Sequence, residues 1–179
     1  HSFLAGTDGN LNNNVGYDFS LRKENDSTYG SQISTRTEAY YLFNPGLRLA
    51  LSNSTGFRNP SLYETFDPTY GTRTLKPETT ETKRITVSGK TEIIKGGYSL
   101  NAFKSKISNL ISAASGTYIY YNADGDTNIS GLEGNINSKL GEKLFSNFGF
   151  VTTHKKTSDN KKNILLPRYS ISGSLNYIF

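Results

Sequence analysis

Apolar side chains occupy every second position over long stretches of the chain. In the first clear run, Val15, Tyr17, Phe19 and Leu21 are separated by small or polar residues. Such strict alternation is typical of a strand with one apolar and one polar face, whereas the i, i+3, i+4 spacing of an amphipathic helix is almost absent. The pattern therefore predicts an all-β chain. The same alternation recurs at 38–43, 47–52, 84–89, 132–137 and 169–179.

The alternating runs and the turn residues between them predict nine antiparallel strands. These are residues 1–7, 11–24, 30–43, 47–55, 78–94, 97–111, 117–140, 143–156 and 166–179. Most are longer than the roughly 5–6 residues of an ordinary soluble strand, and several exceed the roughly 9–11 residues that cross a bilayer at a tilt. Within 117–140, the dipeptide Asp124-Gly125 leaves open a small hairpin in place of one long strand.

Short and long connections alternate along the chain. Tight turns are predicted near 8–10, 44–46, 95–97 and 141–142, and long polar loops near 24–30, 55–78, 112–117 and 157–165. Short turns at one end of long strands and long loops at the other are typical of an outer-membrane barrel. The alternative is a soluble β-sandwich or up-and-down barrel, which also alternates but has turns every 8–12 residues without a difference between its ends.

The asymmetry of the connections favours an antiparallel up-and-down transmembrane β-barrel. Bacterial single-chain barrels have an even number of strands, because the first and last strands must run in opposite directions to close the barrel. With about nine strands, we expect the chain to be a partial barrel, a piece of a larger one.

Composition removes several classes of function. The 179 residues include no Cys, which excludes disulfides, thiolate metal sites and a cysteine nucleophile. The net charge of +5 is scattered rather than clustered, so we expect no nucleic-acid partner. Two His residues give no metal-ligand spacing, and we interpret His154 as solvated rather than as a ligand of haem iron or another metal. We find no nucleophile elbow or phosphate loop, and we expect neither enzyme activity nor a cofactor.

The most informative stretch is residues 56–66, Gly-Phe-Arg-Asn-Pro-Ser-Leu-Tyr-Glu-Thr-Phe, followed at 75–81 by Leu-Lys-Pro-Glu-Thr-Thr-Glu. Together they resemble the signature of TonB-dependent outer-membrane receptors, which transport cobalamin, ferric siderophores and haem. Three further segments resemble strands of that family in the same order. They are 102–111, 129–133 and 166–168. The resemblance covers about residues 11–179 and is closest over 47–140.

The resemblance implies that residues 1–179 are part of the C-terminal β-barrel domain of such a receptor, in the outer membrane of a Gram-negative bacterium. Barrels of this family have 22 strands around a plug, and the plug domain and its TonB box are absent from this sequence. We expect an internal segment. The alternative is a true C-terminus, because Phe179 with Tyr177 and Tyr169 resembles the assembly signal at the end of outer-membrane proteins.

Function is likewise implied by the resemblance. The barrel would take part in uptake of a scarce nutrient, with the TonB complex as a partner through the plug and with outer-membrane lipid around it. The signature is most similar to the vitamin B12 and colicin receptor branch, so cobalamin is the first expectation, then a ferric siderophore, then haem. The alternative function is that of a passive porin or a surface adhesin.

Loop residues that combine aromatic and cationic groups are the candidates for ligand binding. For Tyr118 and Tyr120, which adjoin Tyr121, the alternative is an aromatic girdle at the membrane interface. The ligand-binding candidates are Arg58, Tyr63, Tyr70, Arg73, Tyr118 and Tyr120.

A second group of charged residues has an expected structural role facing the lumen or the plug. Glu64, Glu78 and Glu81 can form ion pairs with Arg58 and Arg73 that pin the 55–78 loop, and solvated surface charge is the alternative. Glu133 lies on the polar face of its strand, where a charge inside the barrel needs a cationic partner. On the same strand, Gly131 and Gly134 are expected to assist curvature of the barrel.

Overall fold

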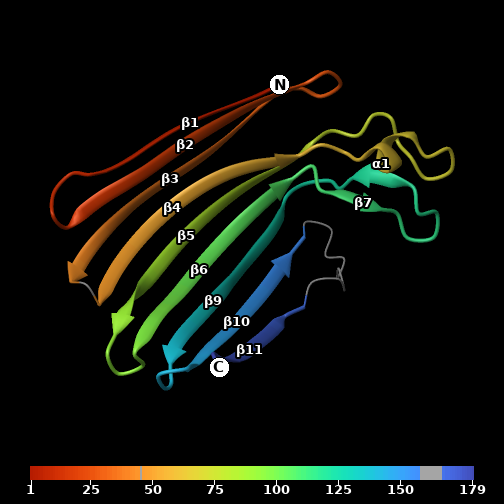
Figure 1. The fold of residues 1–179 in the computed structure, drawn as a ribbon. Helices are drawn as coiled ribbons and strands as arrows, with labels where there is room; N and C mark the ends of the chain where they lie inside the picture. Colours follow the sequence, from red (N-terminus) through yellow and green to blue (C-terminus); the bar gives the residue numbers. More distant parts are fainter. Residues whose placement is uncertain (45, 158–166) are drawn as a thin grey trace.

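The computed structural model describes residues 1–44, 46–157 and 167–179, and it consists mainly of one curved antiparallel sheet (Figure 1). The strands of this sheet are 9 to 15 residues long, which is enough to cross a bilayer at a tilt. They are β1 (Ser2–Asn10), β2 (Val15–Asp26), β3 (Gly30–Asn44), β4 (Leu47–Arg58), β5 (Glu78–Thr91), β6 (Gly96–Ser108), β9 (Thr127–Lys139), β10 (Leu144–Lys156) and β11 (Tyr169–Tyr177).

Every strand of the large sheet pairs with the neighbour that it meets next along the chain. The order is β1-β2-β3-β4-β5-β6-β9-β10-β11, which leaves β1 and β11 as the two edges. A small hairpin, β7 (Ile111–Ala113) with β8 (Tyr120–Asn122), is inserted between β6 and β9. The sheet is thus an up-and-down meander that stays open, which confirms the predicted all-β fold and partial barrel.

The strand register places like residues in rows across the sheet. One row contains Tyr17, Ala39, Leu51, Ile85, Ala102 and Leu132. Because side chains alternate between faces, the adjacent positions carry polar groups such as Glu38, Ser52 and Arg84 on the opposite face. We call the first face the apolar face and the second the polar face. In a transmembrane barrel, the apolar face contacts lipid and the polar face lines the lumen.

The two ends of the sheet differ. At the turn end, three connections are short, at 11–14, 92–95 and 140–143. At the loop end, long connections run through 59–77 and 109–126, and the first includes the helix α1 (Leu62–Phe66). Five of the seven buried residues in the described part of the chain lie at this end. They are Pro60, Thr65, Leu75, Ile111 and Thr127. The loops therefore pack as a small core of their own.

Several predicted boundaries were wrong. The first tight turn lies at 11–14 rather than 8–10, because Gly9 and Asn10 pair with β2, and the side chain of Asn12 accepts hydrogen bonds from the backbone N–H groups of Asn14 and Val15 at 2.8 and 2.9 Å. The predicted strand 117–140 is interrupted at 123–126, and its alternative, a hairpin at Asp124-Gly125, was also wrong, because β8 pairs with β7 and not with β9.

The predicted strand 97–111 was also too long. Asn109 has a positive φ of 54°, which ends β6 at Ser108, and the predicted loop at 112–117 is instead part of the β7–β8 hairpin. The predicted loop at 157–165 lies outside the described residues from 158 onwards, as do Pro45 of the 44–46 turn and Leu166 of the 166–168 motif. Within the described ranges, no helix is long and apolar enough to cross a membrane.

Candidate functional site

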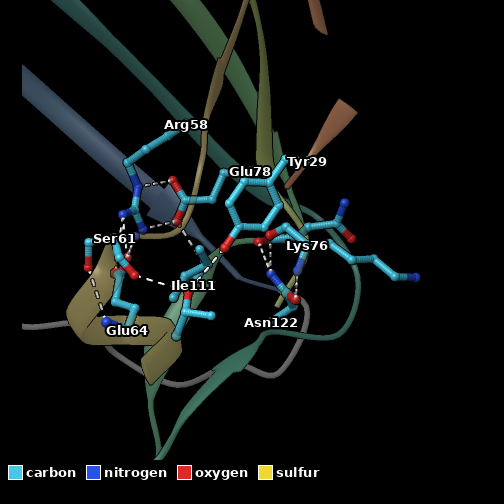
Figure 2. Close-up of polar contacts among 10 residues, drawn as sticks. Tyr29, Arg58, Ser61, Glu64, Lys76, Glu78, Ile111 and Asn122 are labelled. Carbon is cyan, nitrogen blue, oxygen red and sulfur yellow. Dashed lines mark hydrogen bonds and ion pairs between the residues drawn. The ribbon is translucent and has the colours of Figure 1, made fainter. Parts of the chain in front are cut away.

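Three connections meet at the loop end of the sheet (Figure 2). They are the β2–β3 turn, the 59–77 loop and the 109–126 segment that contains the β7–β8 hairpin. Tyr29 of the turn contacts α1 through a hydroxyl–hydroxyl hydrogen bond of 3.1 Å with Thr65. We call this group of three connections the loop assembly.

Arg58, at the end of β4, holds both borders of the 59–77 loop. Its guanidinium donates two hydrogen bonds of 2.9 Å to the carboxylate of Glu78, the first residue of β5. Its Nη1 also donates to Glu64 of α1, at 2.9 and 3.1 Å. Glu78 Oε1 in turn accepts the backbone N–H of Ile111 at 2.7 Å. A single cation therefore connects two strand ends, a helix and the β7–β8 hairpin.

The helix α1 begins with a capping box. The hydroxyl of Ser61 accepts the backbone N–H of Glu64 at 3.1 Å, and the carboxylate of Glu64 accepts the backbone N–H of Ser61 at 2.7 Å. Partial burial raises the pKa of Glu64, but the hydrogen bonds from Arg58 and Ser61 outweigh that effect and leave this pKa below its ordinary value. Glu64 is therefore ionised when the loop is ordered at neutral pH.

The side chain of Asn122 joins the 59–77 loop to the β7–β8 hairpin. Its amide donates to the carbonyls of Lys76 and Asn109 at 3.0 and 2.8 Å, and its Oδ1 accepts the backbone N–H of Lys76 at 2.8 Å. Further along, Thr72 Oγ1 donates to the carbonyl of Tyr120 at 2.6 Å. The two long connections therefore form one unit with specific polar contacts (Figure 2).

Four tyrosines from these two connections lie together in edge-to-face pairs. The ring centroids of Tyr63 and Tyr120 are 6.1 Å apart, and those of Tyr70 and Tyr118 are 6.4 Å apart. Tyr63 and Tyr118 are 53% and 65% exposed, so both offer ring surface to a ligand. Loss of solvent around its hydroxyl, together with the nearby Asp67, raises the pKa of Tyr63 and keeps this hydroxyl protonated.

The structure thus brings most of the predicted site residues into the loop assembly. Arg58, Glu64 and Glu78 form a structural cluster, and the four tyrosines form a second one. Arg73 lies over the ring of Phe66, with its guanidinium carbon 5.7 Å from the ring centroid. Ligand binding by any of these side chains remains a prediction.

Two predicted lumen-facing carboxylates lie on the sheet, away from the loop assembly. Glu133, on the polar face, accepts a 2.6 Å hydrogen bond from Arg84, so its cationic partner comes from the barrel wall. Glu81 shares the apolar face with Ile85 and pairs with Lys83 at 3.4 Å. The expected pairing of Glu81 with Arg58 or Arg73 was wrong, because strand alternation directs Glu81 to the opposite face from Glu78.

Sequence reasoning missed the contacts of Tyr29, Thr72 and Asn122. The capping box at Ser61 and Glu64 has a recognisable sequence signal, Ser-x-x-Glu, that predicts α1. No comparable signal marks the other three residues, since their partners are backbone groups or a threonine hydroxyl from distant segments. Among the described residues, no group of three or more His, Asp or Glu side chains is placed to hold a metal ion.

Comparisons with known proteins agree with this architecture. Residues 5–179 match the family model described as TonB dependent receptor-like, beta-barrel. The chain is 35% identical over 114 residues to a vitamin B12 transporter, BtuB, of Vibrio cholerae, which covers 64% of this chain and 18% of that protein. A vitamin B12 transporter of Photobacterium profundum is 27% identical over 124 residues, covering 65% of this chain and 20% of the relative.

A solved structure with a similar fold is the siderophore receptor PirA from Pseudomonas aeruginosa. It aligns with a TM-score of 0.78 and 19% identity over 98% of this chain and 34% of that receptor. The present chain therefore spans about a fifth of the curated relatives and about a third of this receptor.

Proposed function

The chain belongs to the TonB-dependent receptor-like β-barrel family, and we propose on that basis that it forms part of the barrel of a nutrient transporter in the outer membrane of a Gram-negative bacterium. The barrel wall provides the passage and the loop assembly provides part of the ligand site. Transport of this kind involves binding and conformational change without covalent chemistry. A passive porin or an adhesin would leave the receptor signature at 56–81 without a role.

The observation that carries the proposal is that the loop assembly is ordered by ion pairs of Arg58 and presents four paired tyrosines. Loops of more than about 12–15 residues in compact proteins are usually functional or disordered. Here the 59–77 loop is fixed at its borders by Arg58, and it presents Tyr63 and Tyr70 against Tyr120 and Tyr118. Aromatic rings with few rotatable bonds give contact area at a low entropic cost, which suits the capture of a bulky polar nutrient.

Cobalamin is the nutrient that the observations favour. The relatives with the higher sequence identity are vitamin B12 transporters. The siderophore receptor supports the fold but not the ligand, because its identity is only 19%. Tyr63, Tyr70, Tyr118, Tyr120 and Arg73 are the residues that we assign to cobalamin contact.

The remaining parts of the transporter complete this site in the full-length receptor. The plug that family members carry inside the barrel would contribute further contacts to the ligand. The plug would also be the contact for the TonB complex, which would supply the energy for uptake.

Competition for uptake tests the proposed ligand. Cells that express the full-length receptor as their only route for cobalamin should take up labelled cyanocobalamin, and excess unlabelled cyanocobalamin should abolish the signal. Deletion of the TonB gene should reduce uptake to background. Uptake that persists without TonB would contradict active transport, and uptake of a ferric siderophore in place of cobalamin would contradict the assigned ligand.

A further inference from the structure

Two lysines lie directly opposite each other on the apolar face, next to the loop end. Lys83 of β5 pairs in register with Lys104 of β6, one row beyond Ile85 and Ala102. Like charges at directly opposed cross-strand positions destabilise a sheet. Lys83 has a 3.4 Å contact with Glu81, whereas Lys104 has no ion-pair partner among the residues that the structure describes. The pair therefore retains an excess of positive charge that an external anion would neutralise.

An apolar groove of about 610 Å³ lies beside the two lysines on the same face. Ala39, Leu51, Ile85 and Ala102 line it toward the middle of the strands, and the lysines line it toward the loop end. Adjacent rows on one face are two residues apart, or roughly 7 Å. The ammonium groups of Lys83 and Lys104 therefore lie at one end of an apolar groove that can hold a hydrocarbon chain.

A second hollow of about 530 Å³ continues the basic surface beyond Lys104. Its lining includes Lys104, His154, Lys156 and Asp126. Asp126 does not cancel this charge, because it accepts hydrogen bonds from Lys106 at 2.8 Å and from Ser108 at 2.6 Å. Those contacts hold the pKa of Asp126 below its ordinary value, so the pair with Lys106 is ionic and Lys104 is left as a donor.

We propose that this surface binds an anionic lipid of the outer leaflet, with a headgroup phosphate between Lys83 and Lys104 and an acyl chain in the groove. The apolar face of a membrane barrel already contacts lipid, and the longer loops of such barrels lie on the extracellular side. Lysines one row above the apolar band are at the level where long cationic side chains reach the lipid headgroups. Charge and shape therefore both match a phosphorylated lipid.

Binding of lipid to the full-length receptor tests this site. The receptor in neutral-lipid nanodiscs would be titrated with bisphosphorylated lipid A, with dephosphorylated lipid A and with inorganic phosphate, and bound lipid would be counted by native mass spectrometry. The variant K83Q/K104Q should weaken binding of the phosphorylated lipid at least tenfold. The control K23Q/K90Q removes two lysines elsewhere on β2 and β5 and should change binding less than twofold.

A third variant tests the groove separately from the charge. Ala102→Phe should fill the groove and weaken lipid binding at least threefold while both lysines remain. A comparison of unheated and heated samples in detergent would verify that each variant forms a barrel. A folded barrel should resist unfolding in the unheated sample and unfold in the heated one. Equal binding by K83Q/K104Q and the control would overturn the site, as would equal affinity for dephosphorylated lipid. Competition by inorganic phosphate at the same concentration would overturn the lipid as its occupant.

Discussion

Arg58 and Glu78 lie opposite each other in the β4–β5 register, and their side chains form a two-point ion pair in which both N···O distances are 2.9 Å. This pair closes the base of the 59–77 loop. The side chains of Glu64 and Glu78 are each only 13% exposed, so the cation that they share is important for the order of the loop.

Removal of that cation should open the loop without unfolding the barrel. Arg58→Ala leaves two mostly buried carboxylates without their partner, and hydrogen bonds to charged groups contribute about 1.5–3 kcal/mol each before solvent screening. Since Arg58 is itself half exposed and therefore screened by solvent, we expect the free energy of local opening of the loop to fall by about 1–2 kcal/mol. Hydrogen exchange of residues 59–77 measures this quantity. Arg22→Ala, which removes a more exposed ion pair with Glu24, is the control and should leave exchange in this loop unchanged.

Acid should mobilise the same loop. The pKa of Glu64 is lowered when the loop is ordered, so this carboxylate contributes stability above the ordinary glutamate value of about 4.3. That contribution is lost as the pH falls through the lower, folded-state value. A spin label at Thr69 should stay immobile from neutral pH to about pH 5 and become mobile as the pH is lowered further, through the folded-state pKa of Glu64. Glu64→Gln should reduce the amplitude of that change in mobility. If the change is the same in the Glu64→Gln variant, another titrating group must cause it.

The two faces of β4 should respond differently to a new charge. Leu49 lies on the apolar face between Tyr41 and Val87, and Ser52 lies on the polar face between Glu38 and Arg84. Leu49→Arg should destabilise the full-length receptor by about 2–4 kcal/mol if the residue is at the midplane of the membrane. Ser52→Arg should be much milder in the same denaturant titration. Equal costs would contradict the assignment of faces.

The ion pair of Arg84 and Glu133 spans β6 on the lumen side. Because both side chains are about one-third exposed, the pair is screened, and we expect about 1 kcal/mol of coupling. A double-mutant cycle with Arg84→Gln and Glu133→Gln measures that coupling from unfolding free energies. Additive single effects would show that the two charges act independently.

The sequence predicted the sheet well because each strand has a strict alternation and because connected strands pair with each other. It predicted less at the strand ends. The dipeptide Asp8-Gly9 has turn chemistry, yet the turn forms at 11–14, where the Asn12 side chain accepts two backbone hydrogen bonds. Local propensity cannot rank two such turns without the register of the paired strand.

The sequence predicted which residues belong to the loop assembly, but not most of the contacts between them. The residues at 58–81 indicated ion pairs, and the pairs of Arg58 with Glu64 and Glu78 are present. Asn122 and Thr72 form contacts that depend on tertiary placement alone, because their partners are backbone groups 46 and 48 residues away. Alternation also contained the information on Glu81, since positions 78 and 81 differ by an odd number and must face opposite sides of β5.

Cobalamin uptake by a receptor that lacks the 59–77 loop tip tests the central claim most directly. Residues 61–74 would be replaced by a short Gly-Ser link in the full-length protein, and surface labelling would verify assembly in the outer membrane. We predict that uptake at limiting cobalamin falls at least tenfold, equivalent to about 1.4 kcal/mol if the loss is in binding. Normal uptake by the assembled variant would contradict a ligand-binding role for the loop assembly.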